Sequence, residues 1–338
     1  MKLTRVRLED FRCFGEADFD LQDPVTHEPL EVALLVGGNG SGKSSVLHAL
    51  AGFFTALHSM YAGELLSGQD IRQGAPSAAL TFVWRDWLDR QDLRQREIIV
   101  ETTLESGGLV PPGAGSSLCK QWITRATAPP RRQTGLIVGF DLCRLLPPGR
   151  VVGPNLEDVI QHRCALALAP TISAEGRIRP RAQHLKQWIV NLDSLRAKAK
   201  ADRGEDLPLW HTLRHALNTL LRPYTFEGVD ERFQVLFQTP TGRVPIEALS
   251  DGFRSVFVVV ADLLLRLSLA TEQPDKVLEQ EAICLIDEID AHLHPRWQEN
   301  VIPGLRALFP KVQLIATTHS EIVVSTVEPK NVFRLEEG

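Results

Sequence analysis

The sequence is poor in features that mark secreted, membrane or metal-bound proteins. Its five cysteines are scattered and include no C-x-x-C pair, which fits neither a zinc site nor a disulfide framework. The first residues carry mixed charge without the apolar core of a signal peptide. The longest apolar run, from Val256 to Leu269, is interrupted by Asp262 and Arg266 and is too short to cross a bilayer. We therefore expect a cytoplasmic protein with no membrane partner.

An overall excess of positive charge is also lacking. The formal net charge is −5, so any contact with nucleic acid has to be local. The stretch 177–203, which begins at Arg177 and ends at Arg203, holds eight Lys and Arg residues against Asp193 and Asp202. A solvated helical face is the favoured interpretation in a chain of acidic balance, and a nucleic-acid or partner contact stays open.

What the chain does contain is the composition of a globular protein, with 43% hydrophobic and 23% charged residues. Strand and helix patterns alternate in its last third, which is typical of a parallel α/β sheet. Strands are expected at 3–8, 17–21, 31–36, 79–84, 98–103, 233–238, 282–286, 312–317 and 332–335, and helices at 42–54, 251–269 and 295–308.

These patterns predict one domain over residues 1–338. Its α/β fold has a mostly parallel core sheet, an antiparallel N-terminal β portion and a helical insertion. The insertion is expected within a lobe at 55–225, whose helical subdomain covers about 154–222.

A glycine-rich loop at 37–44, Gly-Gly-Asn-Gly-Ser-Gly-Lys-Ser, follows an expected strand and opens an expected helix. It satisfies G-x-x-x-x-G-K-[ST], in which backbone N–H groups and the helix N-terminus surround phosphates. Lys43 is expected to reach the β- and γ-phosphates of ATP, and Ser44 to ligate Mg²⁺. The expected phosphate-binding residues of this P-loop are Asn39, Gly40, Ser41, Gly42, Lys43, Ser44 and Ser45.

An acidic pair, Asp287 and Glu288, ends the expected strand 282–286. Asp287 is expected to hold Mg²⁺ through water, and Glu288 to orient and deprotonate the attacking water. An acidic strand end is common alone, but it is improbable beside a P-loop. The pattern therefore predicts a Mg²⁺-dependent ATPase.

The segment 249–253, Leu-Ser-Asp-Gly-Phe, resembles the L-S-G-G-Q signature of ABC-class ATPases. Ser250 is a natural helix N-cap, so its hydroxyl and the helix dipole both face an anion. Ser250 and Gly252 are therefore expected to bind nucleotide. The same resemblance makes His319 the switch histidine at the γ-phosphate and Asp290 the D-loop aspartate, both counted with the catalytic residues.

The opening residues 8–14, Leu-Glu-Asp-Phe-Arg-Cys-Phe, look like the N-F-R-x-F start of SMC, RecF and OLD-type ATPases. Arg12 inherits from that resemblance a role in holding nucleotide. The runs 285–295 and 316–320 are most similar to compact prokaryotic defence ATPases such as the Septu ATPase PtuA and retron-associated ATPases. The resemblance covers about 1–54 and 225–338. It implies a homodimer that sandwiches ATP and regulates or positions a separate effector, a nuclease or toxin.

Some positions depart from the ABC pattern. Asp251 replaces the first signature glycine and Phe253 the glutamine. A Q-loop glutamine is not evident, and Gln121 is only a candidate. His292 and His294 invite a metal interpretation, but the following proline fits the first position of a helix and makes His294 its cap.

Three other functions stay open. A DNA-repair or chromosome ATPase would bind DNA directly through 177–203. A transporter nucleotide-binding subunit is disfavoured by the long separation of Lys43 from Ser250 and by the opening motif, and a pseudo-ATPase scaffold by the intact Lys43 and acidic pair. The middle of the chain carries no nuclease pattern, so cleavage by the chain itself is not expected.

Overall fold

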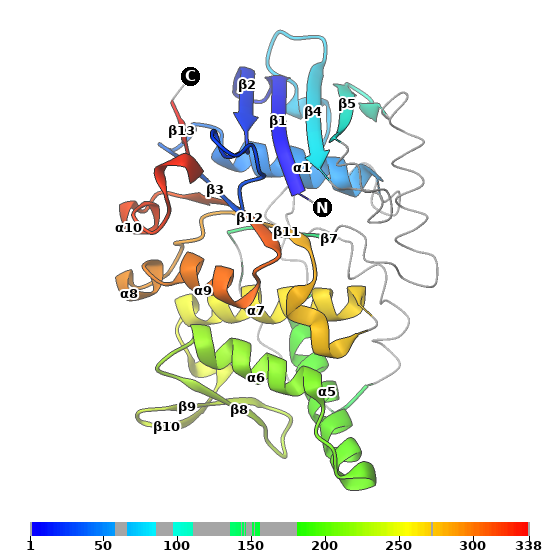
Figure 1. The fold of residues 1–338 in the computed structure, drawn as a ribbon, viewed down its shortest axis with the longest axis vertical. Coiled ribbons are helices and arrows are strands. Elements are labelled where there is room, and N and C mark those ends of the chain that lie inside the picture. The colour runs from blue at the N-terminus through cyan, green and yellow to red at the C-terminus, as the bar shows by residue number, and fades with distance from the viewer. Residues whose placement is uncertain are drawn as a thin grey trace.

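The computed structural model of the protein describes residues 2–57, 66–85, 97–110, 136–142, 144, 146, 151, 153–155, 181–271 and 273–336. Its elements form stacked layers (Figure 1). An antiparallel sheet lies above helix α1 (Lys43–Leu57), a parallel sheet lies below α1, and a helical layer lies beneath the parallel sheet.

The parallel sheet is at the centre of the molecule. Its strand order is β13-β3-β12-β11-β7, and every neighbouring pair is parallel. The strands are β3 (Val32–Gly37), β7 (Leu136–Phe140), β11 (Ala282–Ile286), β12 (Val312–Thr318) and β13 (Val332–Leu335). Side chains alternate between two cores: on β3, Leu35 packs toward α1 and the antiparallel sheet, and Leu34 toward the helical layer. Both faces are therefore buried, as a continuous apolar strand requires.

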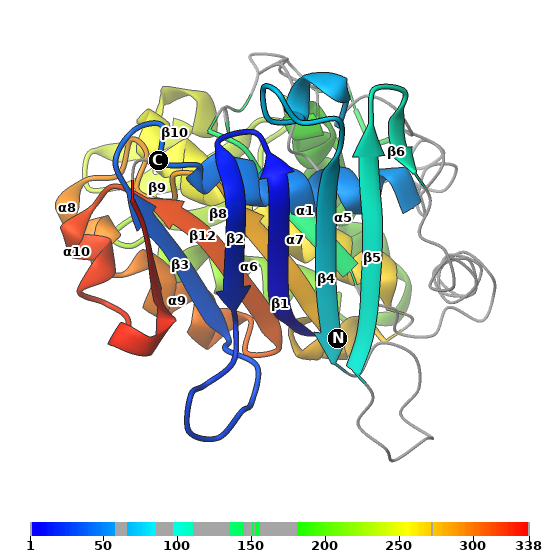
Figure 2. The ribbon, with the colours of Figure 1, turned by 90° about the horizontal axis from the view of Figure 1, so that it is seen from above.

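The antiparallel sheet covers α1 and is seen face-on in Figure 2, in the order β2-β1-β4-β5-β6. Its strands are β1 (Lys2–Phe11), β2 (Phe14–Asp20), β4 (Ala78–Arg85), β5 (Glu97–Glu105) and β6 (Gly108–Val110). The fully buried Gln313 of β12 connects the parallel sheet to the antiparallel sheet by hydrogen bonds. Its side-chain oxygen accepts the Leu3 N–H at 2.8 Å, and its amide donates to the carbonyls of Leu3 at 2.9 Å and Leu30 at 2.8 Å.

The helical layer holds α5 (Arg181–Arg203), α6 (Pro208–Leu220) and the long α7 (Asp251–Ala270). A small antiparallel sheet, β10-β9-β8, lies on its outer side (Figure 1). The remaining elements are β8 (Thr225–Val229), β9 (Val235–Thr239), β10 (Gly242–Pro245), α8 (Pro295–Gln298), α9 (Val301–Leu308), α10 (Glu321–Val324) and short 3-10 turns at Gly68–Asp70, Ile246–Ala248, Pro274–Glu279 and Pro329–Asn331. Among the described residues, no helix has the length and apolarity to cross a membrane.

The predicted α/β class, with its parallel core sheet and antiparallel N-terminal sheet, is confirmed. The predicted helix 295–308 is wrong, because it is two helices, α8 and α9. Pro303 lacks the N–H that would bond to Glu299 and is tolerated only in the first turn of a helix, so the chain starts α9 anew at Val301. Strands β6, β7, β8 and β10 were not expected.

The range 55–225, expected as an inserted lobe, contributes β4–β6 to the antiparallel sheet and β7 to the parallel sheet. Its β portion is therefore part of the two core sheets. Helices α5 and α6 supply helical structure in the range 154–222, although residues 156–180 lie outside the described part. Gln121, the Q-loop candidate, also lies outside it, as do Cys119, Cys143 and Cys164.

Candidate functional site

The P-loop joins β3 to α1 at the carboxyl edge of the parallel sheet. Gly42 has a φ of +95°, a left-handed conformation that glycine adopts without strain. A Cβ at this position would lie 2.3 Å from the Phe14 ring and 2.6 Å from the Cys13 sulfur. Gly40 has a φ of +83° but open space around it, and with Asn39 it forms the exposed tip of the loop. The turn after β1 therefore closes directly onto the P-loop and requires glycine at position 42.

Lys43, at the first position of α1, points back into the P-loop. Its Nζ donates to the carbonyls of Gly37 at 3.0 Å and Gly38 at 2.6 Å. Burial lowers the pKa of Lys43, and the carboxylates of Glu288 and Asp287 oppose this shift. A buried ammonium hydrogen-bonded to neutral carbonyls is stabilised by a nearby anion, so the position suits a phosphate group.

The P-loop also contains a polar atom without a partner. Among the described residues, the hydroxyl of Ser41 is buried and makes no hydrogen bond. The first N–H groups of α1, at Lys43, Ser44 and Ser45, have no acceptor within the helix. These donors converge where β3 enters α1. They fit the phosphate chain of a nucleotide.

Ser44 and Asp287 come together although 243 residues separate them. The Ser44 hydroxyl donates to Asp287 Oδ1 at 2.9 Å, and the Thr317 hydroxyl donates to the same oxygen at 2.6 Å. The cause is the strand order, because β3, β12 and β11 are adjacent and parallel and their carboxyl ends meet at one edge. A hydroxyl and a carboxylate oxygen are ligands that Mg²⁺ prefers, so this pair fits the predicted metal position.

Glu288 follows Asp287 with a φ of +45°, which is uncommon for a residue other than glycine. Its N–H donates to the Thr317 hydroxyl at 2.6 Å. Thr317 therefore holds both members of the acidic pair, and the sequence analysis missed it. The sequence feature that could have identified Thr317 is a hydroxyl residue near the end of β12. This strand lies between the P-loop strand β3 and the strand β11 that precedes the acidic pair.

Asp290 and His319 are also neighbours. Asp290 Oδ1 accepts hydrogen bonds from the Thr318 hydroxyl and from the His319 backbone N–H, the latter at 3.4 Å. The His319 side chain is exposed at the end of β12. The structure therefore groups Asp290 and His319 with the acidic pair, and their roles at a γ-phosphate stay predictions.

Arg12 lies in the turn between β1 and β2 and is held in place. Its Nε donates to Asp70 Oδ1 at 2.7 Å, and its Nη1 lies 2.7 Å from Nδ1 of His48 on α1. Burial, and next the charge of Arg12, lower the pKa of His48, so the imidazole is neutral at pH 7 and accepts the Arg12 N–H. Arg12 thus sits beside the P-loop helix with a carboxylate partner. Its contact with nucleotide remains a prediction.

The signature segment begins α7 as expected. Ser250 is the N-cap, and its hydroxyl accepts the Phe253 N–H at 3.4 Å. Gly252 packs so closely on the loop after the acidic pair that a Cβ would lie 2.2 Å from the His292 carbonyl oxygen. Helices α1 and α7 cover opposite faces of the parallel sheet (Figure 1). In the described part of the chain, no hydrogen bond or ion pair joins Ser250 to the P-loop.

The alternative metal interpretation receives no support. His294 is the N-cap of α8, with its side chain accepting the Arg296 N–H at 3.3 Å, and Pro295 occupies the first helical position. Across the residues that the structure describes, no group of three His, Cys, Asp or Glu side chains is arranged to hold a metal ion.

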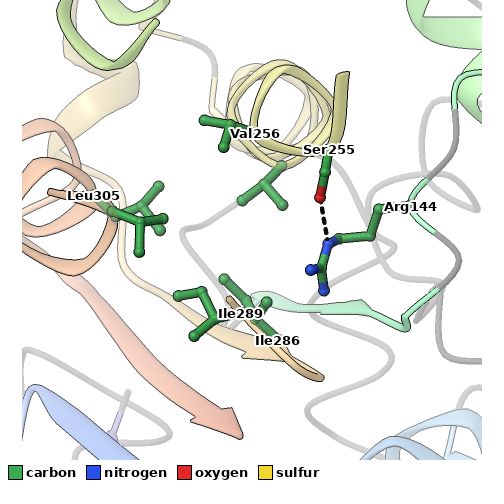
Figure 3. Close-up of a pocket in the computed structure, with 8 residues that line it drawn as sticks. Arg144, Ser255, Val256, Ile286, Ile289 and Leu305 are labelled. Atoms are coloured by element: carbon green, nitrogen blue, oxygen red, sulfur yellow. Dashed lines mark hydrogen bonds between the residues drawn. The ribbon is translucent and has the colours of Figure 1, made fainter. Parts of the chain in front are cut away.

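Arg144 is the residue that the sequence analysis missed most completely. It is 5% exposed and follows β7, next to the acidic strand β11. Its guanidinium donates to the backbone carbonyls of Asp287 and Glu288, the latter at 2.8 Å, and to the Ser255 hydroxyl on α7 at 2.9 Å (Figure 3). No motif marks this arginine, because its partners at the acidic pair and on α7 are distant in sequence.

Two family models match the chain at its two ends. One, described as "AAA ATPase domain", matches residues 1–95, and the other, described as "AAA domain, putative AbiEii toxin, Type IV TA system", matches residues 191–325. The first range contains the P-loop, and the second contains the signature segment, the acidic pair and His319.

Curated relatives are similar over part of their length. The Retron Ec83 probable ATPase of Escherichia coli is 42% identical over 90 residues, which are 27% of this chain and 17% of that protein. The Septu protein PtuA of Bacillus thuringiensis is 36% identical over 107 residues, which are 31% of this chain and 27% of the PtuA chain. PtuA of Bacillus mycoides is 25% identical over 294 residues, which are 86% of this chain and 34% of that PtuA chain. The chain thus spans about a third or less of the length of these relatives.

Solved structures agree with the fold. The SmcHead bound to the C-winged helix domain of ScpA has a TM-score of 0.55 and 14% identity, covering 97% of this chain and 92% of its own. An Smc head domain with an extended coiled coil, bound to the C-terminal domain of ScpA derived from Pyrococcus furiosus, has a TM-score of 0.55 and 15% identity. The match covers 96% of this chain and 92% of that structure's chain. This chain has the fold of an SMC head, matches models of ATPase domains at residues 1–95 and 191–325, and is similar to Septu PtuA proteins and retron ATPases over part of their length.

Proposed function

We propose that the chain binds ATP with Mg²⁺ at the P-loop and hydrolyses it with Glu288 as the general base. The observation that carries this proposal is the 2.9 Å hydrogen bond between Ser44 and Asp287, which joins the P-loop to the acidic pair. Bound Mg²⁺ would neutralise charge on the phosphate oxygens.

The chain's own groups supply the rest of the chemistry. Lys43 and the first N–H groups of α1 hold the phosphates. The Glu288 carboxylate orients a water molecule and accepts its proton, and the Thr317 hydroxyl fixes the Glu288 backbone at 2.6 Å. In this proposal His319, whose backbone N–H bonds to Asp290 at 3.4 Å, contacts the terminal phosphate.

We further propose that two chains share each nucleotide in a two-fold homodimer. Ser250 caps a helix on the face of the sheet opposite to α1, and its hydroxyl accepts only a long bond of 3.4 Å from its own helix. The Ser250 O–H, as a donor, and the helix dipole are therefore suited to the phosphate of a nucleotide held by a second chain.

The test mixes Lys43→Ala chains with Ser250→Arg chains, each inactive alone. A mixed dimer retains one site in which an intact P-loop faces an intact signature segment, so the mixture should recover ATP hydrolysis. Heterodimer formation is measured with two differently tagged chains. Mixtures that form heterodimers and stay inactive would argue against sites shared between chains.

The proposed biological role is anti-phage defence, in which ATP-dependent closure regulates or positions a separate effector. Its support is the similarity to Septu PtuA and retron ATPases and the match to a domain family described with a toxin–antitoxin system. Direct DNA binding through the basic stretch is the second candidate, since Lys198, Lys200 and Arg203 are exposed on α5.

Two measurements separate these roles. The purified chain is incubated with plasmid and single-stranded DNA, ATP and Mg²⁺ or Mn²⁺, and both binding and cleavage are recorded. The effector role predicts no cleavage by the chain alone. Cleavage that survives purification and is lost in a variant of residues 181–220 would contradict it, and binding that weakens steeply with salt would favour the DNA-binding role.

A further inference from the structure

Arg144 is a buried cation whose hydrogen bonds join two elements of the proposed ATPase site. Its Nη2 donates to the Glu288 carbonyl at 2.8 Å, its Nη1 donates to the carbonyls of Asp287 and Asp141, and its Nε donates to the Ser255 hydroxyl at 2.9 Å. Burial lowers its pKa and the surrounding carboxylates oppose that shift, but an arginine keeps its charge. A fixed positive charge thus holds the backbone of the acidic pair.

These bonds bear directly on the conformation of Glu288. Its φ of +45° is uncommon for a side chain with a Cβ, so neighbouring groups must hold it. The Thr317 hydroxyl accepts its N–H and Arg144 donates to its carbonyl, so both peptide groups that flank the Glu288 side chain are fixed. The Glu288 carbonyl also accepts the Ala291 N–H at 2.9 Å, so removing Arg144 would leave this peptide group with its backbone bonds alone.

The same guanidinium reaches the signature helix. Ser255 lies on α7 five positions after the Ser250 cap, and Gly252 touches the His292 backbone between them. A small apolar pocket separates α7 from the strand that carries the acidic pair, with Arg144 and Ser255 at one side and side chains such as Val256, Ile286 and Leu305 around it (Figure 3). Among the described residues, Arg144 provides a polar connection from α7 to the acidic pair on this side of the pocket.

We propose that Arg144 is a positioning residue that couples the signature helix to Glu288 within one chain. Contact of Ser250 with a nucleotide held by the partner subunit would shift α7, and the bond between Ser255 and Arg144 carries that shift to the Glu288 backbone. In this dimer each chain contacts two nucleotides, one in its own P-loop and one, through its signature segment, in the partner's P-loop. Arg144 thereby links these two nucleotides within one chain. This inference rests on the proposed shared ATPase sites and assigns them a means of communication.

The experiment uses the full chain and the substitution Ser255→Ala, which removes the hydroxyl from α7 and leaves Arg144 in place. Alanine is the best helix former, so α7 is retained. Ser268→Ala on the same helix is the matched control, since its hydroxyl bonds only to the Leu265 carbonyl within α7 at 2.7 Å. Ser255→Thr restores a hydroxyl, and Arg144→Lys keeps the charge but loses the fork of donors.

Steady-state kcat and KM for ATP, equilibrium ATP binding and melting temperature are measured for each variant. Ser255→Ala should lower kcat about tenfold with ATP affinity unchanged, because a hydrogen bond to a charged group is lost where the base is positioned. In Ser255→Ala the rate of hydrolysis should also depend less cooperatively on ATP concentration than in the native chain. Ser255→Thr should recover most of the rate, Ser268→Ala should match the native chain, and Arg144→Lys should be slowed at least as much as Ser255→Ala.

A Ser255→Ala chain with native kcat and cooperativity would overturn the coupling while leaving the proposed ATPase intact. Equal loss in Ser255→Ala and Ser268→Ala would also overturn it, because the effect would then be one of helix stability. A native chain that does not hydrolyse ATP would overturn the proposed function, and this inference with it.

Discussion

Replacing Gly252 by alanine tests whether the signature segment must lie directly on the loop after the acidic pair. A Cβ at this position would be 2.2 Å from the His292 carbonyl oxygen and 3.0 Å from the carbonyl carbon. Contacts between unbonded carbon and oxygen atoms lie at about 3.3 Å or more. The two backbones must therefore separate by about 1 Å, since neither neighbour is a side chain that could rotate away.

Two opposing effects decide how much Gly252→Ala changes the free energy of unfolding. Alanine is favoured over glycine in a helix by at most about 1 kcal/mol. Overpacking against atoms that cannot move costs typically about 1–3 kcal/mol. The clash dominates, so the free energy of unfolding should fall by roughly 1–2 kcal/mol. The rate of ATP hydrolysis should fall much more, since a displacement of about 1 Å in a catalytic arrangement can cost about 100-fold.

The assay compares Gly252→Ala with Gly107→Ala, whose Cβ would meet no atom within 4 Å. Steady-state hydrolysis, ATP binding and thermal unfolding are measured on both. Gly252→Ala should bind ATP through its own P-loop and hydrolyse it about 100-fold more slowly, while Gly107→Ala should resemble the native chain. Native hydrolysis by Gly252→Ala would refute the reasoning that this contact holds the signature segment.

Two further substitutions test the P-loop and the connection of the sheets. Gly42→Ala, at a φ of +95° and against Phe14 and Cys13, should weaken ATP binding in a calorimetric titration far more than Gly40→Ala, which has open space; equal losses would contradict this. Gln313→Leu leaves the buried Leu3 N–H without its acceptor and should lower the free energy of unfolding by roughly 2–4 kcal/mol in urea. The exposed Gln238→Leu is its control, and an equal effect of both would refute the anchoring role.

Residues that carry local patterns were predictable. The P-loop, the acidic pair and the Ser250 cap each depend on a few neighbouring residues, and the structure places them at strand and helix ends as expected. Ser44 and Asp287, each expected at Mg²⁺, do lie together, because parallel strands bring their carboxyl ends to one edge.

Features that depend on distant partners were not predictable in the same way. Arg144 bonds to groups 111 and 144 residues away, and nothing in its own segment marks that role. Strands β8 and β10 are short and become a sheet only by pairing with β9. The break between α8 and α9 is different, since Pro303 did carry its signal in the sequence.

The measurement that tests the central claim most directly is ATP hydrolysis by the native chain and by Glu288→Gln, with and without Mg²⁺, beside equilibrium ATP binding. The native chain should hydrolyse ATP only with Mg²⁺. Glu288→Gln should bind ATP as tightly and lose about 10²–10⁴-fold in rate, the typical contribution of a general base. Hydrolysis by Glu288→Gln at the native rate would contradict the assignment of the acidic pair and, with it, the account of the site.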